Sequence, residues 1–435
     1  MPRKIVSNWG NFPSVEANVT ESASLAAITG SIRQLGGVIA RGNGRCYGDS
    51  SLNENIISTL KLNRFQSFDK FNGEMECESG VLLSDILDVI VPEGFFLPVT
   101  PGTKFITLGG AIAADVHGKN HHRDGTFTQH VLYLDLMTET GEITRCSRDE
   151  NSELFRQTCG GMGLTGIILR ARFRLRPIET SYMRQISQKA ANIDQVMRLF
   201  EDINDRTYSV AWLDCLADKR HLGRSILISG EHCRLAELPD YLKCKPLPLA
   251  PRTGISMPFF MPAFLLNRAS VKAFNFLYYY KQLKSEVESI QHFDNYFYPL
   301  DSIKNWNRLY GRKGFVQYQF VLPKESSYEG LKEIFKRIAR SGEGSPLAVL
   351  KLFGKENLDA VMSFPMDGYT LALDFRVTRK VFNLLNELDD LVLIYGGRIY
   401  LAKDARMSER VFHATYSNTV PSGIFSSLQS KRLNY

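Results

Sequence analysis

The chain has 435 residues, of which 44% are hydrophobic and 23% are charged, as in an ordinary soluble globular protein. This length favours two domains over a single core. The net charge of +7 suits an anionic substrate or membrane surface, and the lack of a basic run, zinc finger or RNP-like strip disfavours nucleic acid.

The cysteines and the N-terminus indicate the compartment. Seven cysteines, an odd number without a CxxC pair, favour reduced thiols over a disulfide scaffold. The N-terminal residues lack the apolar core of a signal peptide, and no stretch approaches the ~20 apolar residues of a membrane span. We expect a cytoplasmic protein, soluble or peripheral on the inner face of the membrane, with a periplasmic location left open.

The first part of the chain predicts an α/β unit rich in turns. Helical spacing, strand alternation and turn residues define its elements. In order these are a helix at 25–35, strands at 36–40 and 55–62, a helix at 81–91, a hairpin of 131–137 with 142–146, and a strand at 166–175.

The second part, beginning near Pro177, mixes strands with helices and predicts an α+β domain. Its expected elements are strands at 209–216, 224–232, 314–323, 347–354 and 369–377, and helices at 265–283, 329–340 and 380–395. The division we expect is 1–180, 181–395 and a C-terminal return of 396–435 to the first domain.

The first glycine-rich motif is ARGNGRCYGDS, Ala40–Ser50. Its glycines allow a tight turn whose backbone N–H groups cradle a pyrophosphate. The spacing is not the GxGxxG that opens a helix, which disfavours an NAD-binding Rossmann site. Taken alone, the motif is better explained as an ordinary connecting turn.

The second motif, PGTKFITLGGAIAADVHGKNHH, joins a glycine pair to a cluster of basic side chains. Small residues let the backbone approach a flat or anionic ligand, and imidazoles and an ammonium supply proton-transfer groups. Zinc is disfavoured because the adjacent His121 and His122 splay apart and no cysteine lies at ligand spacing, so no metal is expected. The alternative is a buried turn with surface histidines.

The third motif is CGGMGLTGIILRARFRL, Cys159–Leu175, whose glycines permit close packing on a cofactor or on a neighbouring strand. A turn into a strand is the simpler explanation of this motif by itself. The three motifs together are similar to the FAD-binding half of the vanillyl-alcohol-oxidase superfamily.

More closely, the chain resembles the decaprenylphosphoryl-β-D-ribose oxidase family, the flavoprotein subunit of an epimerase. Further segments carry this resemblance in the same order, and together they span 41–406: LDSIKNWNRLYGRKGFVQYQF, LAVLKLFG, MSFPMDGYTLALDF and GGRIYLAKDAR. The resemblance implies an α+β, two-domain vanillyl-alcohol-oxidase-like fold, with an FAD-binding α/β domain and an antiparallel-sheet substrate domain.

The resemblance also implies the cofactor contacts. The first glycine loop holds no histidine, so we expect FAD to be bound non-covalently; a linkage through Cys46 is the alternative. The residues expected to hold FAD are Ala40, Arg41, Gly42, Asn43, Gly44, Arg45, Cys46, Tyr47, Gly48, Asp49, Ser50, Gly102, Thr107, Leu108, Gly109, Gly110, Ala114, Asp115, Val116, His117, Ile167 and Tyr400.

Around the flavin ring the resemblance implies catalytic and substrate-binding groups. Alcohol oxidation needs a base for the hydroxyl proton while hydride leaves the same carbon, and either His117 or Lys403 could be that base. The catalytic set is Lys403, His117 and Tyr47, and the substrate-binding set is Lys119, Gln317, Gln319, Lys351 and Phe353. Gln317 and Gln319 share one face of a strand, as do Lys351 and Phe353, and lysines suit a sugar phosphate.

The sequence departs from the mycobacterial family members at two positions of YTLALDF. Those members carry a cysteine where this chain has Ala372 and an asparagine where it has Thr370. The cysteine is not needed for hydride transfer, so the resemblance still implies activity. We expect covalent inhibitors that capture that thiol to fail here.

The resemblance implies oxidation of the C2 hydroxyl of a polyprenylphosphoryl-β-D-ribose, with a separate short-chain NAD(P)H-dependent reductase completing epimerisation to an arabinose donor for cell-wall polysaccharide. The alternatives are a flavin oxidase of a soluble sugar, alditol or aldonolactone, and a binding protein with an idle flavin. The aromatic and basic segment 256–285 suits peripheral contact with lipid, or equally a core helix with one solvated stripe.

Overall fold

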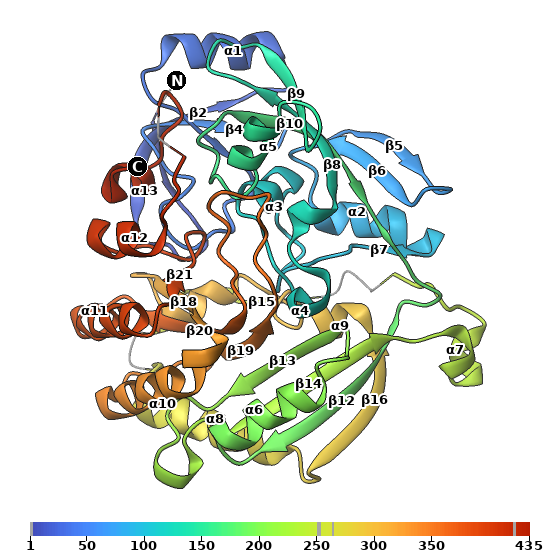
Figure 1. Ribbon diagram of the computed structural model, residues 1–435, viewed down its shortest axis with the longest axis vertical. Helices are drawn as coiled ribbons and strands as arrows, with labels where there is room; N and C mark the ends of the chain where they lie inside the picture. Colours follow the sequence, from blue (N-terminus) through green and yellow to red (C-terminus); the bar gives the residue numbers. More distant parts are fainter. Residues whose placement is uncertain (1–2, 250–253, 263–264, 421–422) are drawn as a thin grey trace.

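The computed structural model describes residues 3–249, 254–262, 265–420 and 423–435. Two sheets lie in the half drawn at the top of Figure 1, and a larger sheet with its helices forms the half below. The helices of the first 180 residues are α1 (Leu25–Gln34), α2 (Leu83–Ile90), α3 (Leu108–Ala113), α4 (His121–Asp124) and α5 (Ser152–Thr158).

The two upper sheets arise from the turn-rich first part of the chain. A four-stranded sheet has the order β1 (Lys4–Ser7), β2 (Ser14–Glu21), β4 (Asn55–Ser58), β3 (Ile39–Arg41). A five-stranded antiparallel sheet has the order β5 (Phe65–Asp69), β6 (Glu74–Glu78), β10 (Ile167–Arg174), β8 (Val131–Met137), β9 (Ile143–Ser147). The predicted hairpin around Thr140 and Gly141 is confirmed by the β8–β9 pairing.

The lower half is built on one antiparallel sheet. Its order is β16 (Glu286–His292), β12 (Tyr182–Ala190), β14 (Ser225–His232), β13 (Tyr208–Leu213), β19 (Ala348–Phe353), β20 (Gly368–Arg376), β18 (Phe315–Pro323), β21 (Arg398–Ile399). Its apolar face packs in one core with α6 (Ile193–Asp202), α10 (Lys324–Ser341) and α11 (Arg379–Ile394). The expected α+β fold with an antiparallel-sheet second half is therefore confirmed.

Strand register gives this sheet a second face with polar side chains. Gln317 pairs with Asp374, Gln319 with Ala372, and Lys351 with Thr370 across neighbouring strands. Because side chains alternate along a strand, these residues point to the same side. That side faces the upper half of the molecule.

The remaining elements are two short strand pairs and five further helices. Short strand pairs join β7 (Phe95–Phe96) to β11 (Arg176–Pro177) and β15 (Ile255–Ser256) to β17 (Ile303–Lys304). The other helices are α7 (Asp240–Lys243), α8 (Arg268–Lys281), α9 (Phe293–Phe297), α12 (Glu409–Thr415) and α13 (Leu428–Leu433). No helix in the described part of the chain combines the length and apolar character that crossing a bilayer requires.

Several predicted element bounds were wrong. The strand expected to reach Leu62 ends at Ser58, because Leu62 closes a turn by donating its N–H to the carbonyl of Thr59. The helix expected from Glu329 begins at Lys324, directly after Pro323, through a polar first turn without an apolar stripe. The strand β12 was missed because its residues, YMRQISQKA, are mostly polar.

The C-terminal segment returns to the upper half, where α12 and α13 lie near the N-terminus (Figure 1). Phe425 forms a parallel bridge with Val38, and the backbone of Val38 bonds to residues on both sides of Phe425. The loop after β21 lies between the two halves.

Candidate active site

A cavity of about 340 Å³ lies between the first glycine loop, segment 101–117 and the polar face of the large sheet. Most of the residues expected at the cofactor or substrate line it. They are Ala40, Gly42, Asn43, Gly44, Arg45, Cys46, Tyr47, Ser50, Gly102, Thr107, Gly109, Gly110, Ala114, Val116, His117, Gln317, Gln319, Lys351, Tyr400 and Lys403.

Three residues of the first glycine loop that were expected at the cofactor lie behind the cavity wall. The Arg41 guanidinium donates to the carbonyl of Ser7. Asp49 forms an ion pair with Arg432, and Gly48 packs so closely that a Cβ there would lie 1.7 Å from the carbonyl oxygen of Asp404. These residues hold the loop in place.

The other expected residues outside the lining are buried nearby. Leu108 and Ile167 lie in apolar core clusters. Asp115 accepts hydrogen bonds from Thr128, Ser363 and Asn357. The remaining two belong to the substrate set: the Lys119 ammonium lies 4.2 Å from the ring centre of Tyr296, and the Phe353 ring lies 4.8 Å from that of His117.

The first glycine loop fits a pyrophosphate. Among the described residues, the N–H groups of Asn43, Gly44, Arg45 and Cys46 have no acceptor within the protein. Gly44 has a φ of +60°, which a residue with a Cβ rarely adopts. The loop therefore presents free backbone donors to the cavity, as an anion-binding turn does.

The opposite wall also fits a bound dinucleotide. A Cβ at Gly102 would meet no protein atom within 4 Å, so the space beside this backbone is open. Ser79 Oγ and His117 Nδ1 are buried and have no partner among the residues described. Unsatisfied buried polar atoms along a cavity wall indicate a polar ligand, and the lining as a whole fits FAD.

Lys403 lies on the turn after β21, where the cavity meets the first loop. Its ammonium is 3.9 Å from the ring centre of Tyr47, and the Tyr47 N–H donates to the carbonyl of Ala402. Burial lowers the pKa of Lys403 to about 7, with a further lowering by Lys351 and an opposing contribution from Asp374. A neutral amine is thus accessible near neutral pH.

Asp374 was missed by the sequence reasoning. Its carboxylate accepts hydrogen bonds from Gln317 Nε2 at 2.5 Å and from the hydroxyl of Tyr310 at 3.4 Å. Burial raises the pKa of Asp374 to about 7, against the lowering effects of Gln317 and Lys403. Its position two residues after Ala372 on the same strand could have identified it.

His117 is held as a neutral imidazole. Burial, reinforced by Lys351, lowers its pKa well below the ordinary value. The Thr370 hydroxyl donates to the carbonyl of Phe320 and accepts from Gln319 Nε2, which orients the Gln319 amide. That amide nitrogen lies 3.0 Å from His117 Nε2, so Nε2 accepts and the ring proton sits on the unpartnered Nδ1.

Two half-buried lysines give the site a positive potential. Burial lowers the pKa of Lys351 to about 8, and burial together with Lys351 lowers that of Lys119 to about 7. Lys351 lines the cavity, whereas Lys119 is bonded to the carbonyl of Tyr296. Neither lysine forms an ion pair with a carboxylate of the described residues, which favours an anionic ligand.

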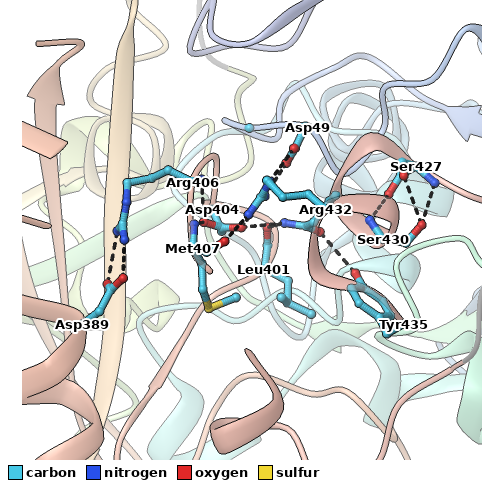
Figure 2. A network of polar contacts seen from close by, with 12 residues as sticks. Asp49, Asp389, Leu401, Asp404, Arg406, Met407, Ser427, Ser430, Arg432 and Tyr435 are labelled. Atoms are coloured by element: carbon cyan, nitrogen blue, oxygen red, sulfur yellow. Dashed lines mark hydrogen bonds and ion pairs between the residues drawn. The ribbon is translucent and has the colours of Figure 1, made fainter. Parts of the chain in front are cut away.

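A polar network fixes the loop that carries Lys403 (Figure 2). Arg432 of α13 binds Asp49 through two hydrogen bonds of 2.8 and 3.0 Å and lies 2.7 Å from Asp404. Asp404 also accepts the N–H groups of Arg406 and Met407. The network joins the C-terminal helix to both the glycine loop and the loop of Lys403.

Aromatic and acidic lining residues were also missed. Trp9, Asp301 and Trp306 contribute to the wall, and the Arg45 guanidinium lies 4.0 Å from the ring centre of Trp9. Trp9 lies outside every motif of the sequence analysis, which left no local signal. Asp301 and Trp306 both fall within the LDSIKNWNRLYGRKGF segment that carried the family resemblance.

The adjacent histidines point away from one another. His121 Nδ1 accepts the N–H of Gly354, while His122 Nε2 lies 2.8 Å from the carbonyl of Arg206. No group of three or more metal-ligating side chains gathers within the described ranges. All seven cysteines are free thiols.

Comparison with known proteins defines the class. Residues 13–147 match the FAD binding domain family, and this domain together with the cavity defines an FAD-dependent oxidoreductase. The chain is 36% identical, over 99% of its length and 97% of the relative's, to decaprenylphosphoryl-β-D-ribose oxidase of Mycolicibacterium smegmatis. The chain belongs to the decaprenylphosphoryl-β-D-ribose oxidase family.

Other relatives are more distant. An uncharacterised protein of Streptomyces coelicolor is 30% identical over 81% of this chain and all of its own length. L-gulonolactone oxidase of Mus musculus is 26% identical over 34% of each chain.

Proposed function

We propose that this protein oxidises the C2 hydroxyl of a polyprenylphosphoryl-β-D-ribose to the 2-keto sugar, as the first half of an epimerisation. The observation that carries the proposal is the placement of Lys403, Tyr47 and Asp374 around one cavity beside the cofactor loop. The full-length similarity to an oxidase of that phosphosugar supports the substrate class.

In this mechanism Lys403 is the general base. Its pKa of about 7 leaves a substantial neutral fraction at neutral pH, and the amine takes the C2 hydroxyl proton. Bound FAD supplies the acceptor for the hydride that leaves C2. The Tyr47 ring then stabilises the ammonium through their cation–π contact.

His117 has a different role. Because its Nε2 accepts from Gln319, the lone pair that a base needs is already engaged. The free Nδ1–H donates a hydrogen bond into the cavity, to the cofactor or to a sugar oxygen. Of the two candidate bases left open by the sequence, we assign the role to Lys403.

The substrate phosphate is bound by Lys351. This lysine lines the cavity and its pKa is lowered by desolvation, so a phosphodiester would restore its ordinary protonation by supplying a counter-charge. Gln317 and Gln319, on β18, hold the sugar hydroxyls. Lys119 reinforces the positive potential from behind the cavity wall.

The alternative is oxidation of a soluble sugar, alditol or aldonolactone, which the partial similarity to L-gulonolactone oxidase favours. Anaerobic bleaching of the flavin by a panel of substrates separates the candidates. We expect bleaching by a prenylphosphoryl ribose and not by ribose, ribose 5-phosphate, alditols or lactones. Bleaching by a free sugar or lactone alone would refute the lipid-linked substrate, and no bleaching by any of them would favour an idle flavin.

The keto product needs a partner enzyme. Return of the C2 ketone to a hydroxyl of opposite configuration requires hydride, and we infer a short-chain NAD(P)H-dependent reductase as the functional partner. Adding that reductase with NADPH to the oxidase and substrate should convert the ribosyl lipid to its arabinosyl epimer.

A further inference from the structure

An exposed apolar and basic strip runs along α8. Phe276, Leu277 and Tyr280 are 53%, 68% and 46% exposed, although each is a large apolar side chain. Lys272 and Lys281, nine residues apart, lie about 180° from each other around the helix, so they border the apolar strip on its two edges, and both are exposed. Apolar side chains flanked by lysines on one helix face are typical of interfacial helices.

The charged side chains between Asp240 and Glu286 are all basic. The sequence contains no Asp or Glu between Asp240 and Glu286, whereas Lys243, Lys245, Lys272, Lys281 and Lys284 all fall in that interval. No acidic side chain lies within ion-pair distance of Lys272, Lys281 or Lys284 among the described residues. The surface therefore has uncompensated positive charge beside exposed apolar groups.

This surface continues to the wall of the cavity. Segment 255–261 carries Phe259, which is 61% exposed, and the N–H groups of Met257 and Met261 donate to the carbonyls of Lys304 and Arg308. Trp306, between those two residues, lines the cavity. The exposed aromatic groups thus lie on a segment bonded directly to the cavity wall.

The helix itself is firmly held on the cavity side of the large sheet. Trp212 pairs with the cavity-lining Val349, and its ring lies 4.5 Å from that of Tyr278 on α8. The Lys189 ammonium donates to the carbonyl of Gln282 at the end of the helix. The buried side of α8 packs against the large sheet, so its exposed strip is the side on which a partner can bind.

We propose that α8 and segment 255–261 form a docking face for an anionic lipid bilayer, which brings the cavity wall at Trp306 against the membrane. The inference rests on the proposed function, because a prenyl chain that stays in the bilayer requires the cavity to open at its surface. Positive charge without acidic neighbours selects an anionic bilayer over a neutral one.

Vesicle co-sedimentation of the FAD-loaded protein tests the docking face. We expect binding to phosphatidylcholine vesicles containing phosphatidylglycerol and at least tenfold weaker binding to pure phosphatidylcholine. Phe276→Ser/Leu277→Ser should abolish binding, and Lys272→Gln/Lys281→Gln should weaken it about 30-fold at low salt. Phe71→Ser, at a side chain 96% exposed on the turn between β5 and β6, is the matched control and should bind normally.

The variants must keep their flavin content and melting temperature, since these surface residues lie outside the cavity. With substrate in vesicles, the docking variants should lose activity at least tenfold, whereas a short-chain, water-soluble prenylphosphoryl ribose should be oxidised as by the unmodified protein. Equal binding to both vesicle types, no binding, or a wild-type dimer that these substitutions dissociate would overturn the docking face. If neither the unmodified protein nor any variant oxidises the short-chain substrate, the proposed function is overturned instead. The vesicle-binding result then still decides the docking face.

Discussion

The Lys403 ammonium lies over the ring of Tyr47, 3.9 Å from its centre, although the two residues are on loops far apart in the chain. The Tyr47 N–H to Ala402 carbonyl bond fixes the same pair of loops through the backbone. The loop of Lys403 and the first glycine loop are therefore one structural unit.

Replacing Lys403 by Met should lower the rate of substrate-driven flavin reduction by about 10²–10⁴-fold, the usual contribution of a general base. Lys403→Arg should be equally inactive, because a guanidinium stays protonated. Stopped-flow absorbance under anaerobic conditions measures the rate. Both variants should stay yellow, and exposed Lys380→Met should be normal; rapid reduction by either Lys403 variant would exclude it as the base.

The rate should depend on pH with an inflection near the pKa of Lys403, about 7. Deprotonation creates the base, so kcat/KM should rise with pH through this region and level off above it. Asp374→Asn removes the carboxylate that raises the pKa of Lys403, so the inflection should move to lower pH. A shift to higher pH, or the same shift in the exposed Asp390→Asn control, would contradict this role.

Removing the Arg432 guanidinium should destabilise the fold. Arg432→Met leaves Asp49 and Asp404 buried without a counter-charge, which should cost about 3 kcal/mol in the free energy of unfolding. Arg410→Met removes an exposed pair with Asp390 and should cost less than about 1 kcal/mol. Urea unfolding of the FAD-loaded forms measures both free energies. Equal decreases in the two variants would show that the buried network stabilises the fold no more than an exposed ion pair does.

The cavity should accept a thiol at position 372. Ala372 lines the cavity on β20, between Gln319 and Val349 of the neighbouring strands. Ala372→Cys should become sensitive to inhibitors that capture the family's cysteine, with the added mass found on this peptide. The unmodified protein should resist them; labelling of Cys46, which also lines the cavity, would instead show that another thiol suffices.

FAD should be released when the protein is denatured. The loop offers no histidine, and Cys46 Sγ lies 3.2 Å from Ser51 Oγ in a local contact. Acid precipitation should therefore leave all of the flavin in the supernatant, and intact-mass analysis should show the bare chain. Flavin retained by the pellet and lost in Cys46→Ser would establish the cysteine linkage.

Sequence patterns predicted what depends on local spacing. Gln317 and Gln319 do share a face, and so do Lys351 and Phe353, because alternation along a strand is fixed by backbone geometry. The family resemblance supplied the segments that meet at the cavity. It did so for Tyr47 and Lys403, whose contact no local pattern could indicate.

What the sequence could not supply depends on contacts between distant residues. Strand alternation places Asp374 on the same face as Ala372, but its hydrogen bond from Gln317 exists only because β18 lies beside β20. Asp49 reads as part of a phosphate loop, yet its carboxylate is occupied by Arg432. The hydrogen bond that engages His117 Nε2 comes from a residue 202 positions away, so the choice between the two bases needed the fold.

The ion pair between Asp49 and Arg432 also bears on the order of assembly during synthesis. The two residues are 383 positions apart in the chain. While a ribosome is still making the chain, the glycine loop is present long before its anchoring guanidinium. Stable uptake of flavin should therefore follow release of α13 from the exit tunnel, so a nascent chain stalled before Arg432 should retain the cofactor poorly.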